Sequence, residues 1–374
     1  MKKLLSLLAI ITMSAVLLVG CGGQEYEIAL ITDKGNIDDK SFNQGAWEGV
    51  VAFAEENDIT HQYYKPEEAS DAGYLASIAL AVEGGAKVIV TPGFLFEVPI
   101  YEAQTLYPEV KFILLDGAPH TADYSTFETK DNVASIMYAE EESGYLAGYA
   151  AVADGMTELG FMGGMAVPAV QAFGYGFLQG AEDAAAEMGL TEVNVTYHYT
   201  GNFEENPTNK ATAKTMFQEG VEVIFAAGGS VGKSVMSAAS EEEAKVIGVD
   251  VDQRYDSETV ITSATKGLAA SVIQVLEAIY VNDNWATFGG TTTYFNATND
   301  GVGLPTSVIG DENADAFDRF DSFTLADYEA VYEMLVDGSV DPIRSITVAD
   351  ADGYATATEL VDGLGLTIVN VEVR

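Results

Sequence analysis

Polar side chains crowd one short loop near the start of the chain. The stretch TDKGNIDDKSFNQ, residues 32–44, follows an apolar run and precedes a helical pattern. Its carboxylates and amides could bind the edge of a polar ligand, and its phenyl ring, Phe42, could stack on a flat one. The loop is therefore either a capped surface turn or one wall of a ligand site.

Similar groups stand where other apolar runs end. In an open α/β sheet, ligands bind beyond the carboxyl ends of the strands. Any one of the aspartates alone is more commonly a helix cap or turn residue. The set, which combines carboxylates, a second ring and two glycines, predicts a single ligand site. Its members are Asp33, Asp116, Phe203, Gly228, Gly229 and Asp250.

A rival motif overlaps this set. AAGGSVGKS, residues 226–234, has the spacing of a phosphate-binding loop, but Ala227 replaces its first glycine. The apolar run that ends at Asp250 could supply a magnesium ligand. A nucleotide hydrolase is therefore one alternative, and a nucleoside hydrolase that uses the aspartates of residues 33–39 is another. We favour the simpler interpretation, in which the glycines let backbone approach a small ligand.

The sequence predicts neither a metal nor a cofactor. The spacing of residues 33–41 departs from that of a calcium loop and lacks the closing glutamate. Asp38 and Asp39 instead fit as negative charges at the positive end of a helix that begins near Ser41. No metal spacing relates the three histidines, which are His61, His120 and His198.

The amino terminus has the pattern of an export signal. Two lysines precede an apolar stretch that ends in LVGC, and Cys21 is the single cysteine of the chain. This pattern resembles a bacterial lipobox, in which the signal, residues 1–20, is removed and the cysteine is acylated. Two or more acyl chains anchor a protein stably. We expect residues 21–25 to link this anchor to a protein on the outer face of the cell membrane.

Charge excludes some partners. The chain has 58 acidic and 17 basic side chains and a formal net charge of −41. Such a surface repels phosphate backbones, so a nucleic-acid partner is not expected.

Apolar runs alternate with helical patterns along the 374 residues, which is typical of parallel sheets covered on both faces. The pattern restarts after Ala153, so we predict two doubly wound lobes. The first comprises residues 26–138 and 253–290, and the second residues 139–252 and 291–374. In the tail, residues 290–305 suggest a hairpin, 325–336 a helix and 365–374 a last strand.

The run TDKGNIDDKSFNQGAWEG, residues 32–49, resembles the signature of the basic membrane protein family, the purine nucleoside receptors of ABC importers. The resemblance continues through residues 132–151, 173–181, 221–229, 246–253 and 262–267. It implies a type I periplasmic-binding fold, in which two Rossmann-like lobes joined by crossing segments close on a nucleoside.

The resemblance also implies roles for individual residues. Phe42 and Phe203 match opposing rings that hold the base, and Asn43 and Asp33 match groups beside it. Gly228 and Gly229 match a glycine contact. Asp250 and Lys266 match the acid and lysine that hold the sugar. Asp116 is the choice for a further aspartate, with Asp131 as the alternative.

Physical chemistry supports these roles. Two rings can clamp a purine, and a carboxylate can accept hydrogen bonds from both hydroxyls of a ribose. The predicted function is capture of a nucleoside, without turnover, for a membrane ABC permease. A monomer is expected, and a sugar receptor is the alternative within the binding class.

Overall fold

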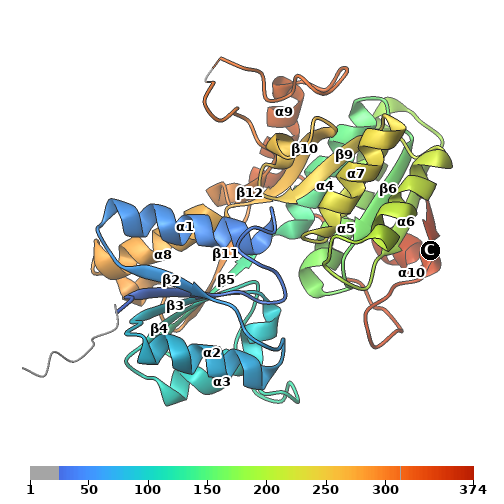
Figure 1. The fold of residues 1–374 in the computed structure, drawn as a ribbon. Coiled ribbons are helices and arrows are strands. Elements are labelled where there is room, and N and C mark those ends of the chain that lie inside the picture. Colours follow the sequence, from blue (N-terminus) through green and yellow to red (C-terminus); the bar gives the residue numbers. More distant parts are fainter. Residues whose placement is uncertain (1–24, 312) are drawn as a thin grey trace, which may run out of the picture.

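The computed structural model describes residues 25–311 and 313–374. The predicted signal peptide, Cys21 and most of the predicted linker lie outside these residues. The described chain forms two α/β lobes that lie side by side (Figure 1).

A six-stranded sheet, wholly parallel, forms the centre of the first lobe, in the order β11-β5-β4-β3-β1-β2. Its four central strands are nearly continuous apolar runs, as expected where a sheet is buried on both faces, whereas the edge strands β2 and β11 are more polar and more exposed. The strands are β1 (Ile28–Ile31), β2 (His61–Tyr64), β3 (Val88–Pro92), β4 (Lys111–Leu115), β5 (Val133–Tyr138) and β11 (Thr291–Phe295). One face packs on α1 (Phe42–Glu56) and α8 (Leu268–Tyr280), and the other on α2 (Asp71–Glu83) and α3 (Glu97–Leu106).

A seven-stranded sheet, in the order β12-β10-β9-β8-β6-β7-β13, forms the centre of the second lobe. All neighbours are parallel except β12, which is antiparallel to β10. The strands are β6 (Glu158–Gly163), β7 (Val193–Tyr199), β8 (Val223–Ala227), β9 (Lys245–Asp250), β10 (Val260–Lys266), β12 (Val302–Gly303) and β13 (Val369–Val373). Helices α4 (Glu140–Ala153) and α5 (Pro168–Met188) cover one face, and α6 (Pro207–Gln218) and α7 (Val231–Glu242) the other.

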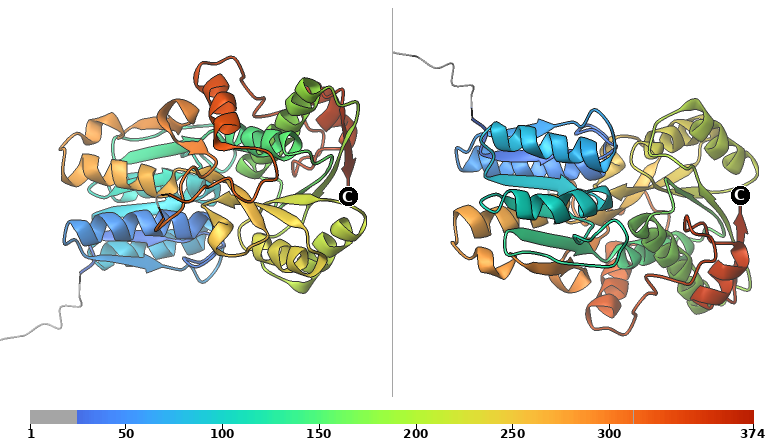
Figure 2. Two further views of the ribbon diagram at one scale, coloured as in Figure 1. Left: turned by 90° about the horizontal axis from the view of Figure 1, so that it is seen from above. Right: turned by 90° about the horizontal axis from the view of Figure 1, so that it is seen from below.

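The predicted doubly wound lobes are confirmed, but the predicted boundary between them is wrong at two places. The predicted boundary places β10 in the first lobe, but this strand pairs in the second sheet, and it places β11 in the second lobe, but this strand pairs with β5. The chain therefore crosses between lobes three times, at residues 138–140, 266–268 and 295–302. Figure 2 shows the consequence, with α8, in orange, beside α1, in blue.

The tail also departs from the prediction in one respect. The expected hairpin does not form, because β11 and β12 join different sheets. The predicted helix is present as α9 (Leu325–Val336), and the predicted last strand, β13, extends the second sheet beside β7. A short helix, α10 (Ala357–Leu364), precedes that strand. Short 3₁₀ turns lie at Phe94–Phe96, Gln253–Tyr255, Trp285–Thr287 and Ala297–Asn299.

Helices α4 and α5 pack with their backbones in contact. A methyl group on Gly144 or Gly148 would overlap a carbonyl oxygen of α5, and one on Gly176 or Gly180 would overlap a carbonyl oxygen of α4. Only glycine permits this approach. The pair consequently forms a close-packed unit at the edge of the space between the lobes.

Candidate functional site

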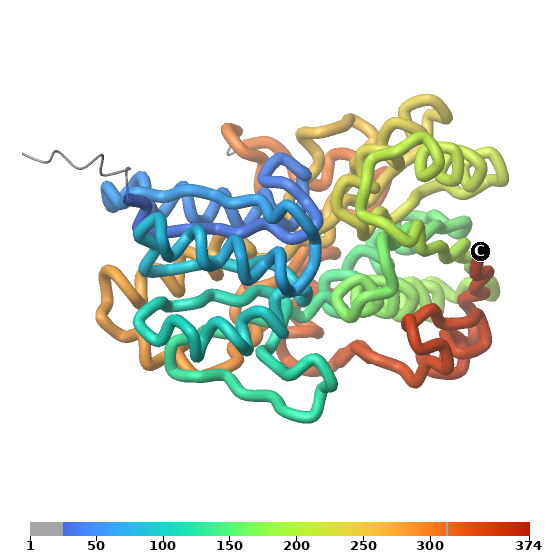
Figure 3. Tube along the Cα trace, turned by 60° about the horizontal axis from the view of Figure 1, so that its bottom comes forward, coloured from blue at the N-terminus to red at the C-terminus, as the bar shows by residue number. Residues whose placement is uncertain are grey.

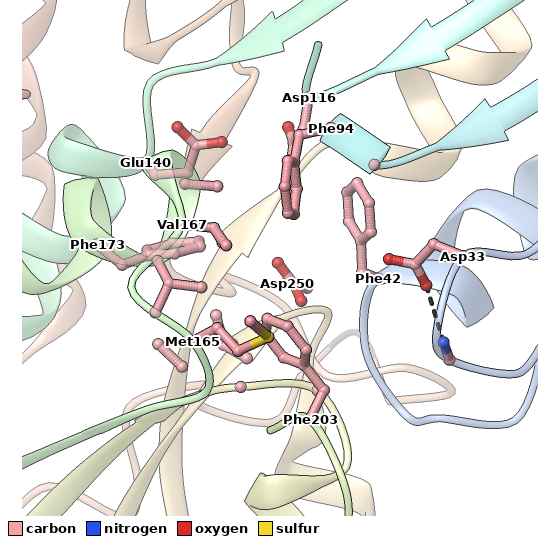
Figure 4. A pocket seen from close by; sticks show the side chains of 18 of the residues that line it. Asp33, Phe42, Phe94, Asp116, Glu140, Met165, Val167, Phe173, Phe203 and Asp250 are labelled. Atoms are coloured by element: carbon pink, nitrogen blue, oxygen red, sulfur yellow. Dashed lines mark hydrogen bonds between the residues drawn. The ribbon is translucent and has the colours of Figure 1, made fainter. Parts of the chain in front are cut away.

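A cavity of about 1000 Å³, including its open mouth, lies between the lobes. Its lining includes all nine residues that the sequence analysis selected. Figure 4 shows rings and carboxylates from both lobes directed into this space. The nine are Asp33, Phe42, Asn43, Asp116, Phe203, Gly228, Gly229, Asp250 and Lys266.

The two predicted rings enter the cavity from opposite lobes. Phe42 is the first residue of α1, and Phe203 lies in the loop between β7 and α6. That loop is fixed because the Asn209 amide donates to Asn202 Oδ1 at 3.0 Å and to the Glu204 carbonyl at 2.8 Å. The two rings therefore supply one apolar surface on each lobe.

Charged groups surround Lys266, whose side chain is only 2% exposed. Its ammonium lies 2.5 Å from Asp116 Oδ2, 3.1 Å from Glu140 Oε1 and 3.8 Å from Asp250 Oδ1. It also lies 4.7 Å from the centre of the Phe42 ring, within the range of a cation–π contact. The first lobe supplies Asp116 and Phe42, so this cluster joins the two lobes.

The backbone aims two of these carboxylates in the same way. Asp116 follows β4 and Asp250 ends β9, and both have left-handed backbone, with φ of 55° and 67°. Aspartate tolerates this conformation better than most residues. It turns both carboxylates out of their strands and into the cavity, one from each lobe.

Burial and pairing set the protonation of the cluster. Burial raises the pKa of Asp116 to about 7, although Lys266 opposes this shift. Burial also raises the pKa of Asp250, against the effects of Lys266 and Ser41. Burial lowers the pKa of Lys266, but the nearby carboxylates outweigh it and the pKa is raised. The lysine therefore stays charged, and Asp116 can take up a proton near neutral pH.

A second polar group occupies the start of α1. The Asn43 amide donates to Asp33 Oδ1 and to Asp39 Oδ2, both at 2.9 Å. Its oxygen accepts from the Asp33 backbone N–H at 3.2 Å. Asp39 in turn accepts from the N–H groups of Ser41 at 2.9 Å and Gln44 at 3.1 Å, so its negative charge lies at the amino-terminal end of the helix, as predicted. Asp38 instead accepts from the Asn36 amide at 2.8 Å. Both N–H groups of Asn43 are thus committed within the first lobe.

Asp33 keeps an oxygen for a ligand. Its Oδ1 accepts from Gly35 N at 2.9 Å and from Asn43, while its Oδ2 has no hydrogen bond to the described part of the chain. Burial raises the pKa of this carboxyl, although these two hydrogen bonds lower it.

Asp116 and Asp131 were the alternatives for one position. Asp116 lines the cavity, whereas Asp131 is absent from its lining and receives a hydrogen bond from Trp285 Nε1 at its carbonyl, at 2.6 Å.

The phosphate-loop spacing does not form a phosphate site. The Lys233 ammonium donates to the carbonyl of Asp38 at 3.1 Å, and Lys233 does not line the cavity. Ser234 Oγ hydrogen-bonds to the backbone of Asn206. The N–H groups of residues 231–233 bond to carbonyls three residues earlier. Gly228 and Gly229 do line the cavity, as the simpler interpretation required.

Several lining residues were not selected from the sequence. Phe94 and Glu140 follow strands β3 and β5, so the strand-end rule could have found them. Phe173 lies within α5, where a buried apolar residue is expected to be part of the core, and Arg344 lies within an irregular segment, where no periodic pattern marks it. Among residues 25–311 and 313–374, no three His, Cys, Asp or Glu side chains form a group suited to a metal ion.

Comparison with known proteins agrees with this geometry. A family model described as ABC transporter substrate-binding protein PnrA-like matches residues 27–331. An ABC transporter nucleoside-binding protein of Lactococcus lactis is 29% identical, over 84% of this chain and 94% of that protein. Basic membrane protein D of Borreliella burgdorferi is 30% identical, over 74% of this chain and 78% of its own.

A solved structure gives the same answer for the fold. An ABC transporter solute-binding protein of Aeropyrum pernix is similar with a TM-score of 0.74 and 25% identity, and the match covers 87% of this chain and 95% of that one. Fold, cavity and family match together show that the chain belongs to the PnrA-like family of ABC transporter substrate-binding proteins.

Proposed function

We propose that the protein is a lipid-anchored extracytoplasmic receptor that captures a purine nucleoside between its lobes and delivers it to an ABC importer. The observation that carries the proposal is the pair of rings, Phe42 and Phe203, that enter from opposite lobes a cavity whose polar lining includes five carboxylates. A flat base fits between two rings, and each stack contributes about 1–3 kcal/mol.

The charged cluster suits a sugar. Asp116 Oδ1 is buried and has no hydrogen-bond partner among the described residues. An unpaired buried acceptor is costly, so a ligand that donates a hydroxyl there is favoured. Asp250 and Lys266 lie next to it and offer a further acceptor and donor. Hydroxyl groups on adjacent carbons could therefore be held by Asp116, Asp250 and Lys266.

The far end of the cavity suits the edge of the base. The free Oδ2 of Asp33 can accept a ring or exocyclic N–H group, which purines have. Asn43 holds Asp33 in place through the hydrogen bonds described above. We assign Asn43 mainly a supporting role, with the second lone pair of its oxygen left for the ligand.

The site supports capture by closure of the lobes. Ser41 Oγ donates to Asp250 Oδ2, and Gln253 donates to the Lys40 carbonyl at 2.6 Å, so the lobes touch beside the cavity. A ligand that contacts both lobes favours the closed arrangement, and one that contacts a single lobe does not. The permease would recognise the closed, loaded protein.

Anchoring follows from Cys21 and the signal pattern before it. Among residues 25–311 and 313–374, none of the helices combines the length and the apolar character of a membrane span. Acyl chains on Cys21 would hold the receptor at the outer face of the membrane.

Isothermal titration tests the proposal. The full-length protein, purified in detergent, is stripped of ligand by unfolding and refolding, and then titrated with guanosine, inosine, adenosine, uridine, ribose and ATP. We expect one-to-one binding of purine nucleosides and no heat with ribose or ATP. Magnesium-dependent heat with ATP alone, or binding of ribose alone, would contradict the proposal.

A further inference from the structure

The segment that follows α9 lies beyond the family match, which ends at residue 331. It has no helix or strand between residues 337 and 356, yet α5 holds it at two points. The Gln179 amide donates to the Ile343 carbonyl at 3.0 Å and accepts from its N–H at 2.8 Å. Gln171, eight residues earlier on the helix, donates to the Gly353 carbonyl at 2.7 Å. Figure 3 shows the segment running from the junction of the lobes along the second lobe.

Arg344 of this segment reaches the first crossing between the lobes. Its Nη1 donates to the Tyr138 carbonyl at 2.8 Å and to Glu141 Oε2 at 2.5 Å. Its Nη2 lies 2.7 Å from Glu140 Oε2. Tyr138 ends β5 and Glu140 begins α4, so a single guanidinium contacts both ends of the crossing.

Glu140 connects Arg344 to the charged end of the cavity. It is fully buried, and its two oxygens face two cations, with Lys266 at 3.1 Å from Oε1 and Arg344 at 2.7 Å from Oε2. Removal of one partner from a buried carboxylate is strongly destabilising, because it leaves part of the buried charge unpaired. The carboxylate is then expected to attract its remaining cationic partner more closely. Without Arg344, Lys266 would be the only basic side chain within 4.0 Å of Glu140 in the described chain.

We propose that Arg344 is a positioning residue for the sugar of the ligand. By pairing with Glu140, it leaves Lys266 placed between Asp116 and Asp250, where the hydroxyl groups of a nucleoside would bind. The inference rests on the proposed function and names a residue of the carboxyl-terminal segment that acts on the same site. In this arrangement Lys266 is charged. Burial lowers its pKa, but the three carboxylates raise the pKa by a larger amount, so the net shift is upward.

A hydroxyl-deletion cycle tests the inference. Guanosine, inosine and adenosine, each paired with its 2′,3′-dideoxy counterpart, are titrated into the full-length wild type and into Arg344→Gln. We expect the substitution to weaken binding of each nucleoside by about tenfold, a coupling typical of one ion-pair network. Binding of the dideoxy counterpart should change by less than about twofold, because it lacks the hydroxyls that Lys266 serves.

Charge-matched variants complete the test. Arg374→Gln removes an arginine that pairs with Glu219 and Glu372, outside the cavity lining, and should leave affinity unchanged. Glu140→Gln combined with Arg344→Gln removes both charges and should restore nucleoside affinity to within about threefold of wild type. Thermal unfolding shows whether Arg344→Gln alone is folded. If it is not, the double variant is the one whose nucleoside affinity tests the inference.

Each other outcome counts against a distinct claim. Equal losses for nucleoside and dideoxynucleoside, or a double variant as weak as Arg344→Gln, would overturn the positioning role. Normal binding by Arg344→Gln would overturn it too, while the proposed function stands. A wild type that binds no nucleoside would overturn both.

Discussion

Two residues of the cavity carry the sharpest prediction at the scale of single side chains. Phe42→Ala removes one wall of the stack, and we expect it to weaken nucleoside binding by roughly 1–3 kcal/mol. Asp250→Ala removes an acceptor that the second lobe offers to the sugar, and it should also weaken binding. Titration calorimetry measures both effects.

A matched control separates binding from folding. Phe127 is 61% exposed and lies outside the cavity lining, so Phe127→Ala should leave affinity unchanged. If Phe42→Ala and Asp250→Ala stay folded and bind as well as wild type, the assigned site is wrong even though the family assignment stands.

The site was predictable at this scale where a residue follows a strand. Asp116 and Asp250 could be selected because the carboxyl ends of parallel strands share one edge of a sheet. The commitment of both Asn43 N–H groups to Asp33 and Asp39 could not be predicted, since it depends on how the loop folds back on itself. Arg344 could not be predicted as a site residue, because an irregular segment has no periodic pattern that shows which way its side chains point.

The prediction at the scale of elements concerns the α4–α5 pair. Gly148→Ala places a methyl group against the carbonyl of Phe177, so the helices must separate. We expect a loss of about 1–3 kcal/mol in the free energy of unfolding, as for overpacked cores. Nucleoside affinity should fall as well, because α4 begins at Glu140 and α5 carries Phe173. Denaturant unfolding and titration provide the two measurements.

Another helical glycine serves as its control. At Gly232 of α7 an added methyl group would meet no atom closer than 3.7 Å. Gly232→Ala should therefore leave stability unchanged or raise it by up to about 1 kcal/mol through helix propensity. A Gly148→Ala protein as stable as wild type would show that the contact between the helices is not tight.

Elements were easier to predict than their partners. The predicted start of the α1 helix, near Ser41, agrees with the observed start at Phe42, because a polar loop followed by a helical pattern marks it. The exchange of β10 and β11 between lobes was not predicted, because the residue pattern of a single strand does not specify the sheet in which it pairs. Sheet partners are set by crossings that only the assembled chain reveals.

At the scale of the whole molecule, charge should govern stability. The formal net charge is −41, and the excess acidic side chains repel one another more strongly in the compact state than in the unfolded chain. Salt screens this repulsion over about 10 Å at 0.1 M. We therefore expect the unfolding temperature to rise by several degrees between low salt and about 0.5 M sodium chloride.

Choline chloride at equal ionic strength is the control for this experiment. It screens charge as sodium chloride does, without offering a small cation for the carboxylates. Equal rises with both salts would support screening, and an unfolding temperature that stays constant or falls in both would contradict it.

Strand β11 belongs to the first sheet but follows β6 to β10 of the second sheet in the chain, which affects the order in which the two lobes can fold during synthesis. A chain that emerges amino-terminal end first has made β6 to β10 before residues 291–295 exist. Until then β5 is an open edge, and unpaired edges invite pairing with other chains. The first lobe is thus completed only after most of the second has been made. Nascent chains shorter than about residue 295 should therefore be more prone to aggregation and proteolysis than longer ones.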